Sequence, residues 1–251
     1  MQTGKGEFYG GTSGLVIPIS KRDFQPPFNN CSRLQYYAAN LNSIEINSSF
    51  YKLPMPSTVS KWADSVPENF KFTFKLWRNI THNKQLAFNA KDVTRFMDVI
   101  SRGVSKKGCI LVQFPPKVTI AQTEQLTHLL SLLTQANKTQ QWHVAVEFRH
   151  RSWYNDEVYE LLSSFDAGMV LQDMPASPSP QVITAAGFVY LRFHGPEGNY
   201  KGSYADELLY EYAQYVSEWQ EEGRDVYVYF NNTAGDAWNN LCTLADYVRQ
   251  L

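Results

Sequence analysis

The stretch CILVQFPPKVTIAQTEQLTHLLSLLTQANKTQQWHVAVEF, residues 109–148, contains two short apolar segments with a helical pattern between them. The segments CILVQF (109–114) and HVAVEF (143–148) have the β-branched and aromatic content of buried strands. Between them, Thr123–Gln135 places leucines at the three- and four-residue spacing of an amphipathic helix. A strand, a helix and a second strand in this order predict a βαβ unit with parallel strands.

The same alternation continues along the whole of the 251 residues. Further strand patterns begin near Phe8, Ser43, Lys71, Gly168, Phe188 and Asp225, which makes eight in all. Further helical patterns cover Ser32–Asn40, Ser57–Ser65, Ala90–Arg102, Asp156–Phe165, Ala205–Gln220 and Trp238–Arg249. Eight such units in about 250 residues are the size of a (β/α)8 barrel. We therefore expect an α/β protein with a single TIM-type barrel domain over residues 1–251.

The connection after the sixth strand departs from this pattern. It reads MPASPSPQVITAAG (174–187) and carries Pro175, Pro178 and Pro180 in its first half. Proline at this density prevents a full helix. We expect an irregular, helix-poor sixth connection.

Composition limits the function classes. Hydrophobic residues make up 43% of the chain, as in a globular protein with a large core, and the formal net charge is -1. This charge excludes a generally basic protein that coats nucleic acid, although a local basic patch is allowed. The chain shows neither a signal-peptide pattern nor an apolar run of membrane-spanning length, and its three cysteines form no CxxC pair. We expect a cytoplasmic protein with no membrane partner.

Polar residues recur at the C-terminal ends of the predicted strands. Because side chains alternate between the two faces of a strand, Glu147 shares a face with Arg149, and Arg192 shares one with His194. Charges within apolar strands are costly unless they are paired or line a solvated pocket. Active sites of TIM barrels lie at the C-terminal face. The strand-end groups that predict a site there are Glu45, Lys75, Gln113, Glu147, Arg149, Asp173, Arg192 and His194.

Cations outnumber carboxylates at these strand ends. The cations are Lys75, Arg78, Arg149 and Arg192, with His82, His150 and His194 beside them, and the carboxylates are Glu45, Glu147 and Asp173. This excess in a nearly neutral chain predicts a small anionic ligand, and guanidinium geometry favours one that carries phosphate. The alternative is an internal ion-pair network in which Glu45 and Glu147 only neutralise the cations.

Several roles are predicted for individual residues. Imidazole titrates near neutrality, so His194, with Glu147, His82 and Glu45, is the candidate for acid–base catalysis. Asn231 and Asn232 end the eighth strand, where TIM barrels often hold phosphate through backbone N–H groups, and capping of the next helix is the alternative. A divalent metal on His82, Glu147, Asp173 and His194 is less favoured, because neighbouring cations compete for the carboxylates. No metal ligand is assigned, and the cofactor is left unknown.

A set of motifs resembles one protein family along nearly the whole chain. The motifs are YGGTSG (9–14), EINSSFY (45–51), FKLWRNITH (74–82), VQFPP (112–116), EFRHRSW (147–153), YLRFHG (190–195) and YVYFNNTAGDA (227–237). In this order they resemble the domain-of-unknown-function 72 family. The resemblance implies a TIM-type barrel related in fold to sugar isomerases and apurinic endonucleases, with no established activity. Leu15, Val16 and Ile17 stand where the family commonly has aromatic residues.

Two function classes follow. The first is an enzyme, a hydrolase or an isomerase, that acts on a small phosphorylated substrate. The second is a protein that binds or processes nucleic acid, which the kinship to apurinic endonucleases and the basic strand ends suggest. A ligand as long as a nucleic-acid strand needs a basic groove that continues beyond the barrel mouth. The basic residues cluster at strand ends instead, which favours the small ligand.

Overall fold

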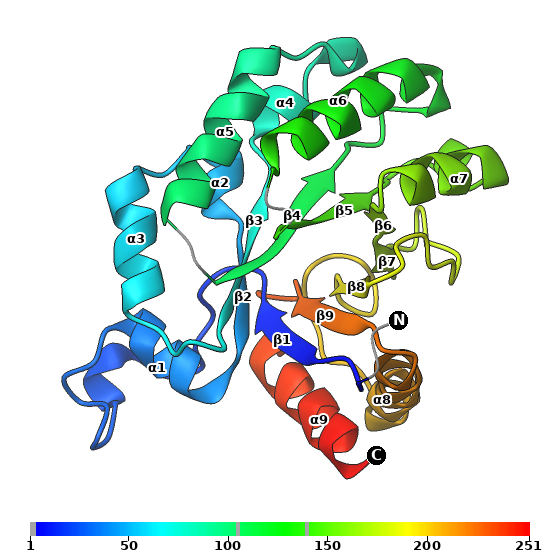
Figure 1. Ribbon diagram of the computed structural model, residues 1–251. Helices are drawn as coiled ribbons and strands as arrows, with labels where there is room; N and C mark the ends of the chain where they lie inside the picture. The colour runs from blue at the N-terminus through cyan, green and yellow to red at the C-terminus, as the bar shows by residue number, and fades with distance from the viewer. Residues whose placement is uncertain (1–3, 104–105, 139–140) are drawn as a thin grey trace.

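The computed structural model describes residues 4–103, 106–138 and 141–251, and its strands are all parallel. One sheet has the order β1-β9-β8-β7, and the other has the order β2-β3-β4-β5-β6 (Figure 1). The strands are β1 (Phe8–Thr12), β2 (Ser43–Ile46), β3 (Lys71–Lys75), β4 (Lys107–Gln113), β5 (His143–Glu147), β6 (Gly168–Met169), β7 (Leu171–Gln172), β8 (Phe188–Phe193) and β9 (Asp225–Phe230).

The two sheets meet at two seams. At the first, Ser13 forms an isolated bridge with Glu45, and the N–H of Gly14 donates to the Glu45 carbonyl at 2.8 Å. At the second, Val170 alone separates β6, which pairs with β5, from β7, which pairs with β8. The predicted sixth strand is thus divided between the sheets. The eight predicted strands follow one another as parallel neighbours, which confirms the α/β fold of TIM-barrel type.

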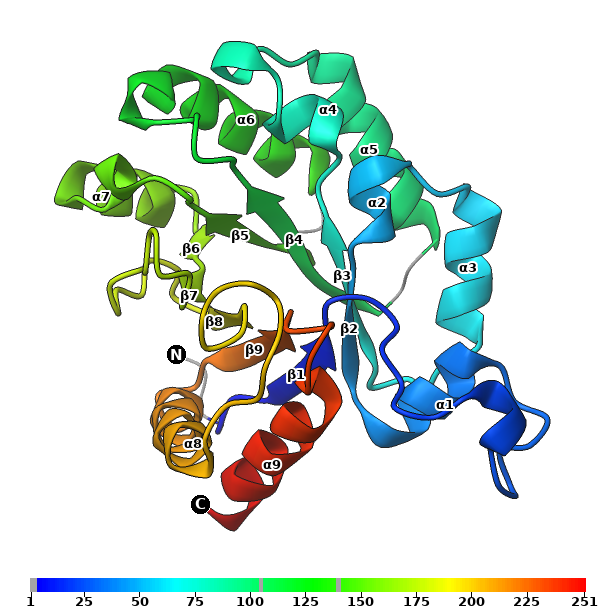
Figure 2. The same ribbon diagram turned by 180° about the vertical axis from the view of Figure 1, so that it is seen from behind.

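Helices lie on the outer side of the strands (Figures 1 and 2). The longer ones are α1 (Arg33–Asn40), α3 (Pro56–Asp64), α5 (Ala90–Gly103), α6 (Thr123–Ala136), α7 (Asp156–Ser164), α8 (Asp206–Glu221) and α9 (Ala237–Gln250). Their bounds agree with the predicted helices to within one or two residues. Local chemistry fixes some of these ends: Ser32 and Gln35 form a capping box on α1, and the Asn155 side chain caps α7.

Short helical turns were not predicted. The one-turn helices α2 (Ser48–Tyr51) and α4 (Arg78–Thr81) follow β2 and β3 directly, and the 3-10 turns are η1 (Lys21–Asp23), η2 (Lys84–Leu86), η3 (Ile120–Gln122) and η4 (Arg151–Trp153). Three or four residues are too few to show a helical period. The connection from β7 to β8 contains no helix, as its prolines predicted.

The core has two layers. The larger apolar cluster fills the space between strands and helices, and the smaller one fills the interior that the strands enclose. The interior cluster consists of Cys109, Leu111, Ala145, Val170, Ala185, Phe188, Tyr190, Tyr227 and Tyr229. The Tyr229 hydroxyl on β9 bonds the hydroxyls of Ser43 at 2.6 Å and Thr73 at 2.7 Å, across to the other sheet. The polar strand-end groups lie next to this interior layer, at the C-terminal ends of the same strands.

Candidate functional site

Arg192 is the centre of the polar cluster at the strand ends. Alternation along β8 points Tyr190, Arg192 and His194 into the interior, and only 1% of the Arg192 side chain is exposed. Its Nε and Nη2 donate to the two carboxylate oxygens of Glu45 at 3.0 and 2.8 Å, and its Nη1 donates to Glu147 Oε2 at 2.9 Å.

The remaining N–H groups of Arg192 also have acceptors: Ser13 Oγ accepts from Nη2, and His194 Nε2 accepts from Nη1. All five donors of Arg192 are therefore used within the protein.

The two glutamates are fully buried and ionised. Burial alone would raise the pKa of Glu45, but the Arg192 charge and its hydrogen bonds lower it, and so do bonds from Tyr190 OH at 2.6 Å and Ser13 Oγ at 2.7 Å. Burial would likewise raise the pKa of Glu147, which Arg149 and then Arg192 hold well below its usual value. Arg149 Nε binds Glu147 Oε1 directly.

The hydrogen bonds of His194 fix its tautomer. Its Nε2 lies 2.8 Å from Arg149 Nη2 and 3.1 Å from Arg192 Nη1, and guanidinium groups can only donate. Nε2 is therefore the unprotonated nitrogen, and Nδ1–H donates to Asp173 Oδ1 at 3.2 Å. Burial lowers the pKa of His194, in spite of Asp173 and Glu147, which raise it. The imidazole is neutral, and both of its nitrogens are engaged.

Lys75 differs from the two arginines. It lies on the interior face of β3, and its Nζ lies 4.5 Å from the centre of the Phe50 ring. Within the described residues, no carboxylate is at ion-pair distance from this ammonium and no hydrogen bond satisfies it. Burial first, and then the charge of Arg192, lower the pKa of Lys75 to about 8. Lys75 is thus a half-buried amine that contacts an aromatic ring and has no ion-pair or hydrogen-bond partner among the described residues.

His82 stands beside Lys75 over the same aromatic ring. It follows α4, its ring centre lies 4.7 Å from that of Phe50, and its Nδ1 lies 2.8 Å from Thr81 Oγ1. Burial, with the charges of Lys75 and Arg78, lowers the pKa of His82 to about 4. Arg78 itself is exposed at the start of α4.

The loops after β8 and β9 bind each other. The N–H groups of Ala234 and Asp236 donate to the carbonyls of Tyr200 and Gly202 at 3.1 and 3.0 Å. Asn232 Nδ2 also donates to the Gly202 carbonyl, at 3.0 Å. These bonds fasten one loop to the other beside Asn231 and Asn232, where a phosphate site was predicted.

The remaining predicted site residues make hydrogen bonds to nearby backbone or side-chain groups. Asn231 continues the ladder through its N–H to the Phe193 carbonyl, and Gln113 Nε2 donates to the Phe114 carbonyl. Asp173 follows β7 and accepts from Tyr204 OH and from the backbone N–H of His194. In the described part of the chain, no three His, Cys, Asp or Glu side chains are placed to hold a metal ion.

The structure adds Ser13, Phe50, Tyr190 and Tyr204 to the predicted cluster. The parity of β8 could have indicated Tyr190, two residues before Arg192. Tyr204 reaches Asp173 from the loop after β8, and no local pattern marks such a contact.

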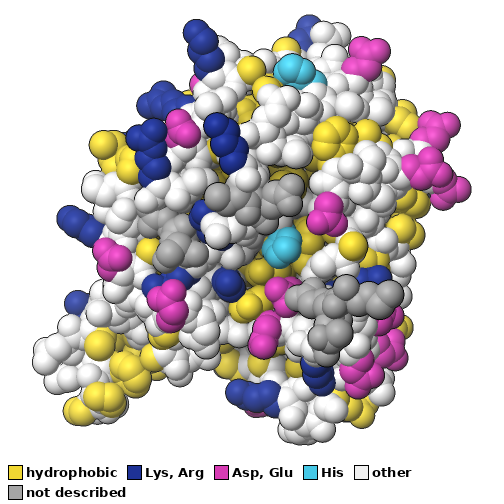
Figure 3. All heavy atoms as spheres, in the orientation of Figure 1, with side chains coloured by type: hydrophobic (Ala, Val, Ile, Leu, Met, Phe, Trp, Pro, Cys, Tyr) yellow, Lys and Arg dark blue, Asp and Glu magenta, His cyan; other side chains and the backbone are white. Residues whose placement is uncertain are grey.

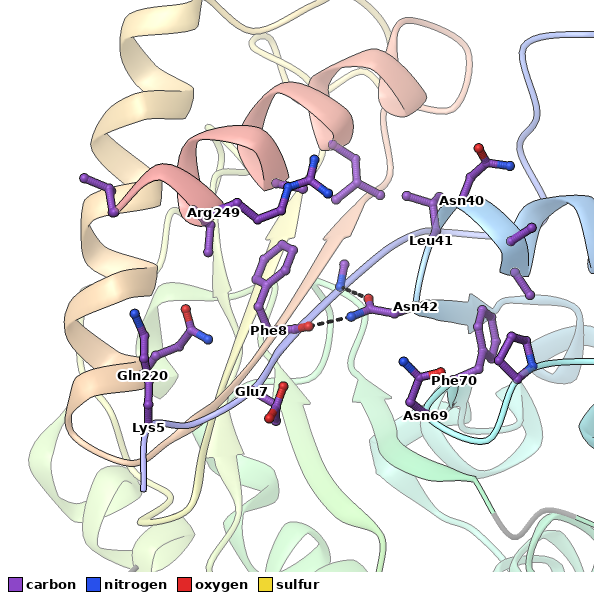
Figure 4. Close-up of a pocket in the computed structure, with 18 residues that line it drawn as sticks. Lys5, Glu7, Phe8, Asn40, Leu41, Asn42, Asn69, Phe70, Gln220 and Arg249 are labelled. Carbon is purple, nitrogen blue, oxygen red and sulfur yellow. Dashed lines mark hydrogen bonds between the residues drawn. The ribbon is translucent and has the colours of Figure 1, made fainter. Parts of the chain in front are cut away.

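A cavity of about 690 Å³ lies elsewhere, between α1, α9 and the start of β1 (Figure 4). There the Asn42 side chain donates to the Phe8 carbonyl at 2.6 Å and accepts from the Gly10 N–H at 2.8 Å. Its walls include Lys5, Gln220 and Arg249. None of the predicted site residues lines it.

Comparison with known proteins places the chain among relatives without an assigned activity. A family model described as "Protein of unknown function DUF72" matches residues 9–251. The chain is 26% identical over 255 residues to the UPF0759 protein YunF of Bacillus subtilis, with 86% of each chain covered. It is 28% identical over 121 residues to the UPF0759 protein YecE of Escherichia coli K12, which covers 48% of this chain and 43% of that one.

Solved structures share the fold. A DUF72 family protein from Enterococcus faecalis matches with a TM-score of 0.80 at 22% identity, over 96% of this chain and 95% of that one. One from Thermotoga maritima matches with a TM-score of 0.73 at 24% identity, over 97% and 99%. A family 2 AP endonuclease from Brucella melitensis matches with a TM-score of 0.56 at 12% identity, over 96% and 99%.

Proposed function

We propose that this chain, which belongs to the DUF72 family of proteins of unknown function, binds a small anionic, phosphate-bearing ligand at the C-terminal mouth. The observation that carries the proposal is the unpartnered ammonium of Lys75. A half-buried cation without a counter-ion is costly, and an incoming anion would remove that cost.

The arginines contribute unequally to this site. Arg192 has no donor left for a ligand, so its role in the proposal is to occupy Glu45 and Glu147 and keep them from Lys75. Arg149 uses Nε and Nη2, which leaves the N–H groups of Nη1 for an anion beside Lys75. Exposed Arg78 is the candidate for a further contact at the rim.

Acid–base chemistry at this site would use His82 in preference to His194. The Nε2 of His82 makes no hydrogen bond within the described residues, whereas both nitrogens of His194 are engaged. Glu45 and Glu147 are held as carboxylates by their arginine partners. A substrate bound to Lys75 would therefore meet a neutral imidazole as its nearest candidate base.

Calorimetric titration with glycerol 3-phosphate tests the proposal. We expect Lys75→Met to weaken binding by about tenfold or more, because a charge-assisted hydrogen bond contributes about 1.5–3 kcal/mol. Lys71→Met is the matched control, since Lys71 lies on the same face of β3 at its other end, over Tyr9. Equal affinity of the wild type and Lys75→Met, or no binding to the wild type, would contradict the anion site.

The alternative is the binding or processing of nucleic acid, and the likeness to an AP endonuclease concerns the fold alone. In the view of Figure 3, Lys and Arg side chains gather over the region of α3 and α5. A single-stranded oligonucleotide whose affinity falls steeply with salt, with no effect of Lys75→Met, would favour this alternative.

A further inference from the structure

We propose that Lys75 is a nucleophilic amine that forms a Schiff base with an aldehyde or ketone that also carries an anionic group. The inference rests on the proposed function, because the same mouth has to bind the anionic group. It adds a covalent step and a substrate class to that function.

The two glutamates pair with the arginines, and neither pairs with Lys75 among the described residues. Both oxygens of Glu45 are taken, by Arg192 together with Ser13 and Tyr190. Both oxygens of Glu147 are taken as well, one by Arg149 and the other by Arg192. Lys75 therefore stands near two carboxylates and two guanidinium groups without an ion pair to either carboxylate. The guanidinium charges lower the pKa of Lys75 and the carboxylate charges raise it, so the arginines offset the stabilisation that the carboxylates give to the ammonium.

The Phe50 ring and burial act on the Lys75 amine in opposite directions. Nζ lies 4.5 Å from the centre of the ring of buried Phe50, and this cation–π contact favours the ammonium. Burial is the largest cause that lowers the pKa of Lys75 to about 8, from 10.5. At pH 7 a larger share of the side chains then carries the neutral amine than for an ordinary lysine. Desolvated lysines of this kind serve as carbonyl nucleophiles in enzymes.

The covalent step needs no reagent beyond protein, ligand and water. The Nζ lone pair forms a bond to the carbonyl carbon while the C=O π pair moves to oxygen. Nζ then gives up one of its protons and the oxygen takes up one, which leaves a neutral carbinolamine whose nitrogen again has a lone pair. A second proton, from the solvent, converts the hydroxyl into water, and the nitrogen lone pair forms the C=N bond of a protonated Schiff base as the water leaves. Water is the only product released, and nothing is oxidised or reduced.

The neighbours of Lys75 define the ligand. The unused N–H groups of Arg149 Nη1 suit a phosphate or carboxylate, and the Nε2 of His82 can exchange a proton with the carbinolamine oxygen. The compound we infer is small and carries its carbonyl a few bonds from its anionic group, as a three-carbon keto phosphate does.

Trapping with sodium borohydride tests the step, because the hydride converts a Schiff base into a stable secondary amine. The protein is incubated with dihydroxyacetone phosphate, reduced and digested, and the adduct is located by mass spectrometry. We expect at least about tenfold more adduct on Lys75 than on Lys71, because the proposed site holds the anionic group of the ligand beside Lys75. Lys75→Arg keeps the charge and should abolish this adduct, whereas Lys71→Arg should retain it.

Two ligands separate the failure of this step from the failure of the anion site. Glycerol 3-phosphate has the anion without the carbonyl and should reduce trapping by competition, while dihydroxyacetone has the carbonyl without the anion and should give at least about tenfold less adduct. Binding of glycerol 3-phosphate with no adduct from the keto phosphate overturns the Schiff base and leaves the anion site standing. Equal trapping of both carbonyl compounds, or equal labelling of Lys71 and Lys75, overturns the inference.

Discussion

At the scale of single residues, the structure divides the strand-end cations into two kinds. Arg192 is saturated by internal partners, whereas Lys75 has neither an ion pair nor a hydrogen bond to its ammonium among the described residues and contacts only the Phe50 ring. The internal ion-pair network and the ligand site, which the sequence left as alternatives, are thus compatible, because different residues carry them.

Arg192→Ala should destabilise the fold. The substitution leaves Glu45 and Glu147 buried without their shared counter-ion, and breaking a buried ion pair costs about 3–5 kcal/mol. Urea unfolding followed by circular dichroism measures this loss. Lys75→Met removes a cation of the same cluster that has no ion pair, and it should cost much less; an equal loss in the two variants would contradict the division.

The sequence predicted that certain side chains lie in one cluster, but it did not predict which hydrogen bonds and ion pairs they form with one another. Strand parity brings Glu45, Glu147 and Arg192 together, because the two-residue period of a strand is a local property. Which carboxylate oxygen each arginine takes depends on distances between strands from both sheets. The isolation of Lys75 could not be predicted for that reason, and neither could the neutral tautomer of His194.

At the scale of elements, side chains join the seam between β1 and β2. Asn42 makes two hydrogen bonds to the backbone of β1. The Tyr37 hydroxyl accepts from the Thr12 N–H and donates to the Ser43 carbonyl, and Ser13 forms a bridge with Glu45. The eight strand patterns in the sequence were enough to predict the order of the elements. The seams could not be predicted, because they depend on how far each pair of strands separates.

Asn42→Ala should weaken this seam. It leaves one N–H and one carbonyl of β1 without a protein partner, and such a loss costs about 1–3 kcal/mol for each group that stays buried. Urea unfolding measures the effect. Asn40→Ala, on the exposed end of α1, should change the free energy of unfolding by less than about 0.5 kcal/mol. Equal effects of the two variants would show that Asn42 does not join the seam.

At the scale of the whole molecule, hydrogen bonds across the interior link the two sheets. Tyr229 bonds Ser43 and Thr73, and Arg192 bonds Glu45 and Glu147. We therefore propose that residues 1–251 unfold as a single domain. Scanning calorimetry should give one transition with equal calorimetric and van't Hoff enthalpies, whereas two resolved transitions would indicate separate units.

Stability should fall in two steps as the pH is lowered. His82 stays neutral in the fold down to about pH 4, whereas an unfolded histidine binds a proton below about pH 6.5, so stability is lost between these values. The depressed pKa values of Glu45 and Glu147 mean that unfolded carboxylates take up protons first, which removes further stability below about pH 4.3.

Thermal melts from pH 8 to pH 3 measure the two steps. Because His143 and His194 also have lowered pKa values, His82→Gln should reduce the upper step without abolishing it and should leave the lower one. Glu147→Gln should likewise reduce the lower step, which Glu45 shares. A melting temperature that stays constant over this range would contradict both assignments.

The thiol of Cys109, within the interior cluster, can report opening of the barrel. Cys109 is fully buried, and burial raises the pKa of its thiol well above the usual value, whereas Cys31 and Cys242 are only half-buried. A thiol-labelling reagent should therefore modify Cys31 and Cys242 in the native protein and reach Cys109 only when the strands separate. The rate of that last modification would report how often the barrel opens, under conditions in which nearly every molecule is folded.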